Sequence, residues 1–104
     1  MNIIAVTSCP SGVAHTYMSA QAIENACKAA GHNVKVETQG SIGIENQLTK
    51  DEISKADYVV LTKDVALKGE ERFKGKTIVR VTVGEAIKKA DAIVKKLEQH
   101  YQSK

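Results

Sequence analysis

Apolar strand-like runs alternate with segments of helical periodicity along this chain of 104 residues, and no other feature limits its fold as strongly. Residues 2–7 are almost continuously apolar and end at turn-forming residues, as a buried strand does. Residues 57–62 contain an equally uninterrupted apolar core, typical of a strand that is covered on both faces. Further strands are predicted at 33–38 and 77–81. The chain therefore reads as an α/β protein.

Three helices separate and follow these strands. Apolar residues recur at helical spacing over residues 16–30, and Gly31 stands where a left-handed C-terminal cap belongs. Thr49-Lys50-Asp51-Glu52 and Thr82-Val83-Gly84-Glu85 have the spacing of capping boxes, which begin helices. We expect one helix to follow the second box, with one face formed by Ala86, Ala90, Ile93 or Val94, Leu97 and Tyr101.

The expected fold is one small doubly wound, Rossmann-like domain over residues 1–104. It has a four-stranded parallel sheet in the order 2-1-3-4, with helices on both faces. Residues 39–48 are read as a loop, and 63–73 as a loop with one or two helical turns. The second strand is placed at an edge, because Val34 and Val36 alternate with Lys35 and Glu37, so that one face reaches water. Ligands of such sheets bind beyond the carboxyl ends of the strands, where the winding reverses.

Charge and composition exclude several classes of protein. Fifteen Lys and Arg against twelve Asp and Glu give a net charge of +3, without a long basic run, so we expect no nucleic-acid partner. The beginning of the chain lacks the pattern of a signal peptide and no segment is long and apolar enough to span a bilayer, so we expect a cytoplasmic protein without membrane insertion. Two cysteines in a reducing compartment are more often reactive or packing residues than a disulfide.

The loop between the first strand and the first helix carries the chemistry. Its sequence is Cys9-Pro10-Ser11-Gly12-Val13-Ala14-His15-Thr16. Residues 11–16 have six backbone N–H groups, and Gly12 allows the backbone to bend closely around a ligand. Amides that converge at a helix N-terminus form an anion site, and they favour the thiolate of a cysteine beside it. Cys9 is therefore the candidate nucleophile, and Ser11, Gly12, Val13, Ala14, His15 and Thr16 are the candidate phosphate-binding residues.

The alternative reading of this loop is a buried packing cysteine beside a tight turn. A strand end, a cysteine, a glycine three residues later and an immediate helix start together favour the functional reading. Cys27 shares the apolar face of the predicted helix with Ile23 and Ala30, so we interpret it as a small hydrophobic residue. His15 either donates a hydrogen bond to a phosphoryl oxygen or caps the loop, and the sequence leaves both roles open.

Other polar residues give weaker signals. His32 and His100 are read as structural, and no histidine pair has metal-ligand spacing, so neither a metal nor a cofactor is expected. Gly40-x-x-Gly43 lacks the context of a nucleotide-binding motif. Asp64 follows the third strand beside the expected site, and is read as a solvated loop carboxylate rather than a residue that supports the site.

The Cys9 loop closely resembles that of the fructose-family enzyme IIB domains of the bacterial phosphoenolpyruvate-dependent sugar phosphotransferase system. Ser11 stands where many members have threonine, a change that keeps the hydroxyl. The resemblance extends over nearly the whole chain, through Glu37-Thr38-Gln39-Gly40-Ser41-Ile42-Gly43, Leu48-Thr49, Ala56-Asp57 and Arg72-Phe73-Lys74-Gly75-Lys76.

This resemblance implies a phosphoryl carrier. A phosphohistidine of enzyme IIA would donate its phosphoryl group to Cys9, and Cys9 would donate it to a sugar held by the membrane permease, enzyme IIC. The permease would recruit the protein to the inner face of the membrane. The permease would also choose the sugar, and the family resemblance implies fructose or a fructose-like or mannosyl compound.

Two alternatives remain at this point. One is a small cysteine-dependent phosphatase or arsenate reductase, although His15 stands where a Cys-x5-Arg loop has its phosphate-clamping arginine, and no Asp-Pro pair is present. The other is a non-catalytic module that only docks on a transporter.

Overall fold

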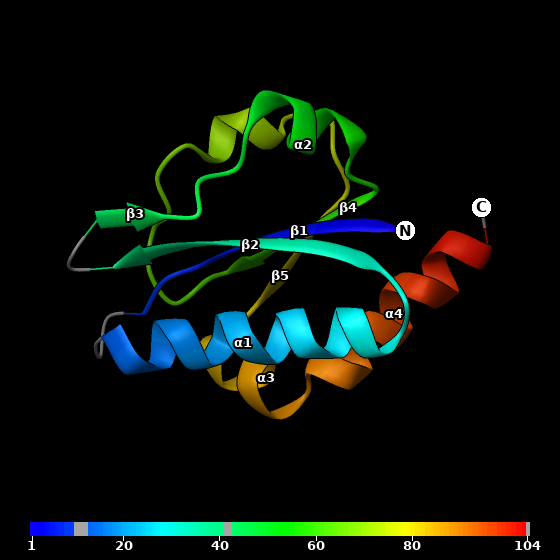
Figure 1. The fold of residues 1–104 in the computed structure, drawn as a ribbon, viewed down its shortest axis with the longest axis horizontal. Helices are drawn as coiled ribbons and strands as arrows, with labels where there is room; N and C mark the ends of the chain where they lie inside the picture. The colour runs from blue at the N-terminus through cyan, green and yellow to red at the C-terminus, as the bar shows by residue number, and fades with distance from the viewer. Residues whose placement is uncertain (10–12, 41–42, 104) are drawn as a thin grey trace.

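The computed structural model describes residues 1–9, 13–40 and 43–103. Its strands and helices alternate along the chain, with one short strand and one additional helix beyond the predicted set (Figure 1). In chain order they are β1 (Asn2–Thr7), α1 (Val13–Ala29), β2 (Asn33–Gly40), β3 (Gly43–Glu45), α2 (Lys50–Lys55), β4 (Tyr58–Thr62), the 3-10 helix η1 (Glu70–Phe73), β5 (Ile78–Val81), α3 (Val83–Lys88) and α4 (Ala90–Gln102).

The sheet has the order β3-β2-β1-β4-β5. The pairs of β1 with β2, β1 with β4, and β4 with β5 are all parallel, which confirms the predicted order of these four strands. In the centre of the sheet, Ala5 lies between Val36 of β2 and Val60 of β4.

The prediction of four strands is wrong, because β3 adds a fifth, antiparallel strand beside the end of β2. The placement of β2 at the edge is also wrong, since β3 takes that position. The three residues of β3 are all exposed. A short strand with no buried face has no apolar alternation, so its sequence resembles that of a loop.

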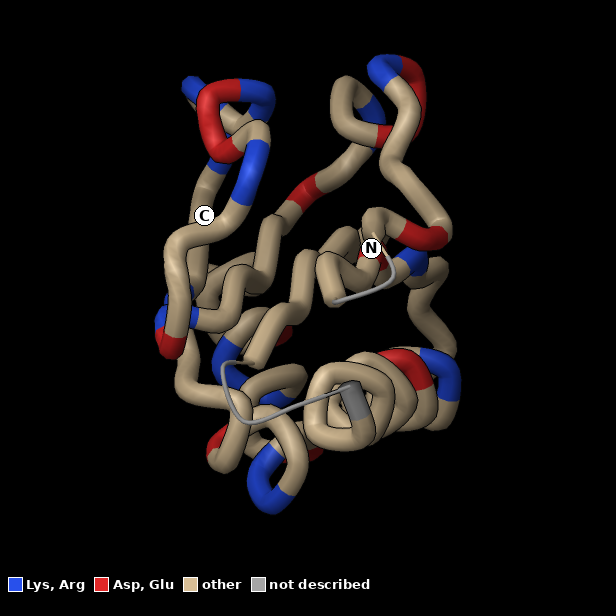
Figure 2. Tube along the Cα trace, turned by 90° about the vertical axis from the view of Figure 1, so that its left-hand side faces the viewer, with Lys and Arg blue, Asp and Glu red and all other residues tan. Residues whose placement is uncertain are grey.

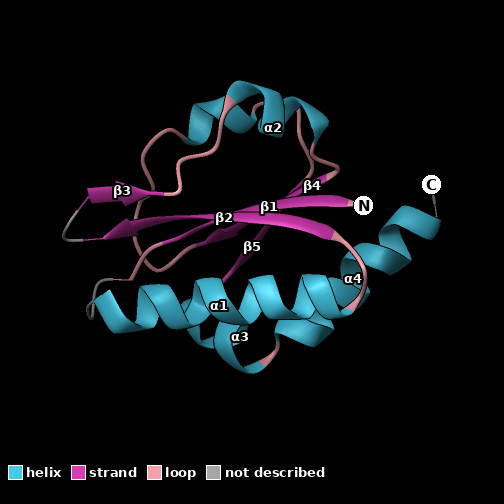
Figure 3. Ribbon diagram, in the orientation of Figure 1, coloured by secondary structure: helices cyan, strands magenta, loops and turns pink. Residues whose placement is uncertain are grey.

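Helices cover both faces of the sheet, as predicted (Figure 3). Alternate residues of β1 face the two sides of the sheet. Ile3 and Ala5 pack in the core cluster that includes residues of α1, α3 and α4, whereas Ile4 and Val6 pack in the cluster that contains Ile53 of α2. This alternation follows from the two-residue period of a strand. A strand buried on both faces must be apolar throughout, which explains why β1 and β4 form the centre of the sheet.

The helix boundaries differ from the predictions at two places. Helix α1 begins at Val13 instead of residue 16, so His15 and Thr16 lie within its first turn. The structure has two helices, α3 and α4, where a single last helix was predicted, because the backbone of Lys89 leaves helical geometry with φ −127° and ψ 27°. The segment contains no glycine or proline at this point, so the sequence gives no breaker signal.

The local start and stop signals are confirmed. Thr49 and Thr82 are N-caps of complete capping boxes, with Glu52 and Glu85 as the reciprocal acceptors. Gly31 has a φ of 83°, the left-handed conformation that a side chain would disfavour, and it ends the turn after α1.

Candidate functional site

The end of β1 is fixed on both sides by hydrogen bonds. The Ser8 N–H donates to Oγ1 of Thr62 at the end of β4, at 3.0 Å, and the Ser8 hydroxyl donates to the carbonyl of Gln39 in β2, at 2.6 Å. One residue earlier, the Thr7 hydroxyl donates to the carbonyl of Thr16 in α1, at 3.1 Å. The residue that follows Ser8 is therefore held at the carboxyl end of three parallel strands, where a doubly wound fold places its ligands.

Cys9 is that residue, and it is half-buried between two hollows. The first hollow, of about 280 Å³, lies toward β2 and β3, and Ser8, Gln39, Ile44, Ala66 and Lys68 contribute to its wall. The second, of about 380 Å³, lies toward α1 and α3, and His15, Met18, Asp64, Ile87 and Lys88 contribute to its wall. Cys9 lines both hollows, so its thiol is placed where a ligand can reach it from outside.

The structure places the other predicted residues as follows. Ser11 and Gly12, together with Pro10, lie outside the described residues. Val13 is the first residue of α1; Ala14 and His15 are exposed in its first turn; and Thr16 is buried. His15 lines the second hollow with Cys9, whereas the carbonyl of Thr16 accepts hydrogen bonds from Thr7 and Ser19 within the fold.

The sequence did not indicate two lysines that approach Cys9 from distant segments. Lys68 comes from the loop before η1 and lines the first hollow, and Lys88 comes from the end of α3 and lines the second. Neither belongs to a recognisable motif in the sequence, and only the winding of the sheet brings them to this end. Lys and Arg positions are otherwise scattered among Asp and Glu positions along the trace, in keeping with the small net charge (Figure 2).

Asp64 has a structural role that the sequence did not indicate. Its Oδ1 accepts a hydrogen bond from the N–H of Val83 at 2.8 Å, which satisfies one of the free amides at the start of α3. Asp64 also lines the second hollow, so this hydrogen bond holds its side chain there against the start of α3.

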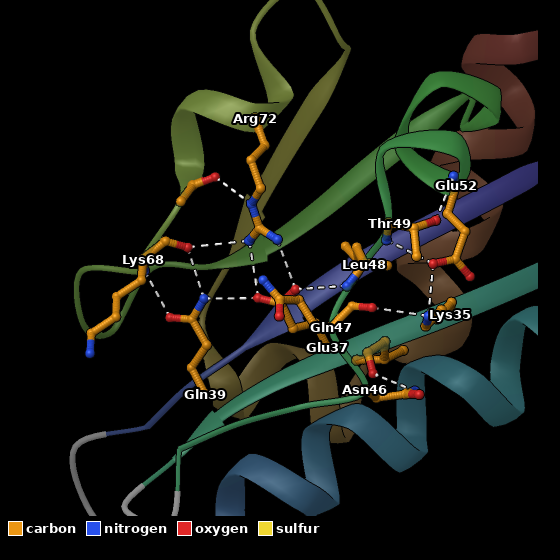
Figure 4. Close-up of polar contacts among 12 residues, drawn as sticks. Lys35, Glu37, Gln39, Asn46, Gln47, Leu48, Thr49, Glu52, Lys68 and Arg72 are labelled. Carbon is orange, nitrogen blue, oxygen red and sulfur yellow. Dashed lines mark hydrogen bonds and ion pairs between the residues drawn. The ribbon is translucent and has the colours of Figure 1, made fainter.

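A buried carboxylate lies behind the first hollow. Glu37 is completely buried, which contradicts its predicted place on a water-facing side of β2. The Arg72 guanidinium donates to both of its oxygens, and the N–H of Leu48 and the amide of Gln39 also donate to it (Figure 4). Burial opposes ionisation, but the hydrogen bonds from Arg72, Gln39 and Leu48 outweigh it and hold the pKa of Glu37 below its ordinary value.

Cys27 is buried, whereas Cys9 is only half-buried. Cys27 lies in α1 and belongs to a core cluster, and its burial, with a smaller contribution from Glu98, raises the pKa of its thiol to about 11. Its interpretation as a packing residue agrees with this environment.

Neither a metal cluster nor a membrane span is found in the described part of the chain. Its His, Cys, Asp and Glu side chains form no group of three or more that could hold a metal ion. None of its helices is both long and apolar enough to cross a bilayer.

A known protein family matches most of the chain. The family described as "PTS system, Lactose/Cellobiose specific IIB subunit", where PTS stands for phosphotransferase system, matches residues 4–96. The chain belongs to the PTS IIB family. IIB components take part in sugar uptake as phosphotransferases, so this chain is a phosphoryl carrier.

Within the IIB family the chain is similar to fructose-like components. It is 65% identical over 98 residues to the "PTS system fructose-like EIIB component 2" of Escherichia coli strain K12, which covers 94% of this chain and 92% of that protein. It is 44% identical to the "Fructose-like PTS system EIIBC component" of the same strain, where the match covers 98% of this chain but only 22% of that protein.

Solved structures of related proteins share the fold. The solution structure of an enzyme IIB subunit from E. coli K12 has a TM-score of 0.92 at 41% identity, and covers 98% of this chain and 94% of that one. A crystal structure of a domain of the fructose-specific IIABC component of Borrelia burgdorferi has a TM-score of 0.85 at 50% identity, and covers 90% and 89% of the two chains.

Proposed function

We propose that Cys9 is the residue that carries the phosphoryl group, as a phosphocysteine formed from a phosphohistidine of enzyme IIA. The thiolate attacks phosphorus, and the bond between phosphorus and the histidine nitrogen breaks with its electron pair going to nitrogen. The histidine ring then leaves as neutral imidazole, with one proton taken up from the solvent. The half-buried position of Cys9 between two open hollows is the observation that carries this proposal. A donor and an acceptor can each reach the sulfur, while Cys27 is closed off in the core.

In the proposed site, residues 11–16 contribute the loop and the first turn of α1. Their backbone N–H groups would bind the phosphoryl oxygens, with Ser11, Gly12, Val13, Ala14, His15 and Thr16 as the contributing residues. Amide donors at a helix N-terminus stabilise negative charge in transfer between thiolate and phosphoryl group without a metal or a nucleotide.

The arginines of the chain favour a carrier over a phosphatase. A Cys-x5-Arg phosphatase clamps its phosphate with a bidentate arginine. The two arginines of this sequence are both engaged elsewhere, Arg72 with Glu37 at 2.9 Å and Arg80 with Glu70 at 2.7 Å. Neither lines a hollow beside Cys9. Weak clamping suits a phosphocysteine that has to last until its sugar acceptor is present.

The proposed acceptor is fructose or a fructose-like sugar, held by the membrane permease IIC. The fructose-like relatives at 65% and 44% identity support this choice. The second of these relatives is named for IIB and IIC together, which supports IIC as the partner of this chain. The protein would then act in the cytoplasm at the inner face of the membrane, where IIC recruits it, as one domain over residues 1–104.

A chase experiment tests the carrier against the alternatives. The protein is phosphorylated by phosphoenolpyruvate, the general phosphotransferase proteins and a fructose-system IIA, then isolated at neutral pH. A carrier keeps its label in buffer and loses it quickly when IIC membranes and fructose are added, or when unphosphorylated IIA is added. A phosphatase would hydrolyse the label and turn over an aryl phosphate repeatedly, and a docking module would take up no label.

A further inference from the structure

Two segments outside the Cys9 loop meet behind the first hollow. Glu37 and Gln39 lie in β2, and Arg72 lies in η1. Arg72 Nη1 and Nη2 donate to the two oxygens of Glu37 at 2.9 and 3.0 Å, and the Gln39 amide donates to Glu37 at 3.0 Å. Glu37 is fully buried and Gln39 is 8% exposed. A buried ionic network is costly to assemble, so what it holds in place is informative.

The network holds the backbone of Lys68 from both sides. The Lys68 N–H donates to Gln39 Oε1 at 2.8 Å, and its carbonyl accepts from Gln39 Nε2 at 2.9 Å and from Arg72 Nη2 at 3.2 Å. One glutamine side chain thus satisfies both backbone groups of Lys68, as a neighbouring strand would (Figure 4). The backbone carbonyl of the same Gln39 accepts from the hydroxyl of Ser8, the residue before Cys9. Gln39 therefore fixes Lys68 and the end of β1 relative to each other.

Lys68 lies on the rim of the first hollow, which Cys9 also lines. Lys68 is exposed and borders that hollow together with Ser8, Cys9 and Gln39. Figure 4 shows its side chain extending from the loop away from Arg72, so the ammonium is not used within the network.

We propose that Glu37, Gln39 and Arg72 form a positioning network that holds Lys68 at the rim of the Cys9 hollow, where its ammonium contacts the phosphoryl group carried by Cys9. This inference rests on the proposed phosphocysteine. A phosphoryl group on a side chain carries about −1.5 to −2 charges at neutral pH, and neutral amides alone leave that charge uncompensated. A lysine supplies a single mobile charge, whereas an arginine would bind two oxygens rigidly. A carrier that must release its phosphoryl group is better served by the lysine.

The test uses two alkylating agents on the free protein and needs no partner. Iodoacetate and iodoacetamide both react with the Cys9 thiolate, but only iodoacetate is an anion. The rate with iodoacetate divided by the rate with iodoacetamide therefore reports the local positive charge. Lys68→Met should lower this ratio about threefold, the effect of one charge a few ångströms away in water, and Lys68→Arg should restore it. Lys74→Met is the control, since Lys74 is exposed in the same segment but lines neither hollow. An unchanged ratio in Lys68→Met would overturn the proposal.

Removal of the network should act through Lys68. Gln39→Ala should lower the ratio by a similar factor, and should add little when it is combined with Lys68→Met, because the charge is already gone. Arg72→Lys is a second variant in case Gln39→Ala folds poorly, as judged by circular dichroism. If the two changes are additive in the double variant, Gln39 does not act by positioning Lys68 and the proposal is wrong.

A phosphorylation assay separates this inference from the function on which it rests. One outcome is that IIA phosphorylates Cys9 at the same rate in wild type and in Lys68→Met, and that the phosphocysteine has the same lifetime in both proteins. In that case the role proposed for Lys68 is refuted, while the carrier function stands. If wild type takes up no phosphoryl group at all, the proposed function itself fails.

Discussion

Arg72 joins both oxygens of Glu37 at 2.9 and 3.0 Å, and thereby ties the 3-10 helix η1 to the middle of β2, 35 residues earlier in the chain. Glu37 has no exposed surface, so its charge depends on this partner. Arg72→Met should therefore lower the free energy of unfolding by about 3 kcal/mol at neutral pH, because it leaves a buried carboxylate without its cation. Urea unfolding of the two proteins measures the difference.

Arg80→Met is the matched control for that prediction. It breaks the ion pair of Arg80 with Glu70, whose side chains are 49% and 33% exposed, and should cost less than about 1 kcal/mol. Equal losses in the two variants would contradict the special role of the buried pair.

The same pair predicts an acid-sensitive part of the stability. The pKa of Glu37 lies below its ordinary value of 4.5 in the folded protein, so its ionisation stabilises the fold above that pH. The stability gap between wild type and Glu37→Gln should be constant from neutral pH to about pH 5 and shrink as the pH falls through the folded pKa. Glu52 and Glu85 also have lowered pKa values, but they titrate in both proteins and cancel in the difference. A gap that is unchanged at pH 3 would show that Glu37 is not held ionised.

The two cysteines should differ sharply in reactivity. A thiol pKa of about 11 leaves only about one Cys27 in 10⁴ as thiolate at pH 7, and its burial adds a steric barrier. Iodoacetamide should therefore modify native protein at Cys9 long before Cys27, and both cysteines only after unfolding. Peptide mapping by mass spectrometry reads the order, and early modification of Cys27 would be inconsistent with the core described above.

Asp64 should contribute to stability rather than to phosphoryl transfer. Asp64→Ala removes the acceptor of the Val83 N–H and should cost about 1 kcal/mol in thermal or urea unfolding. Asp64→Asn keeps a carbonyl oxygen in the same place and should recover most of the loss. If the asparagine variant is as unstable as the alanine variant, the negative charge matters more than the hydrogen bond.

Elements with strong local signals could be predicted from the sequence. The apolar runs of β1 and β4 and the two capping boxes at Thr49 and Thr82 are local patterns, and the structure confirms them. Strand β3 and the break at Lys89 have no such signal, since one is an exposed strand of three residues and the other lacks a glycine or proline.

In the candidate site, too, contacts between residues close in sequence could be predicted, and contacts between distant segments could not. Cys9 and the start of α1 are neighbours in sequence, so their proximity could be predicted. Lys68 and Lys88 reach the same end of the sheet from loops and helices far along the chain, and the contact of Glu37 with Arg72 depends on how these segments fold over β2. No single-sequence pattern encodes such a pairing of distant charges.

Mapping the phosphoryl group after transfer shows directly whether Cys9 carries it. Wild type, Cys9→Ser and Cys27→Ser are incubated with phosphoenolpyruvate, the general phosphotransferase proteins and a fructose-system IIA, and the intact masses and the peptides are then measured. We expect one added phosphoryl group in wild type and in Cys27→Ser, located on Cys9, and none in Cys9→Ser, which remains folded. A phosphoryl group located on Cys27 or on a histidine, or undiminished uptake by Cys9→Ser, would overturn the assignment to Cys9.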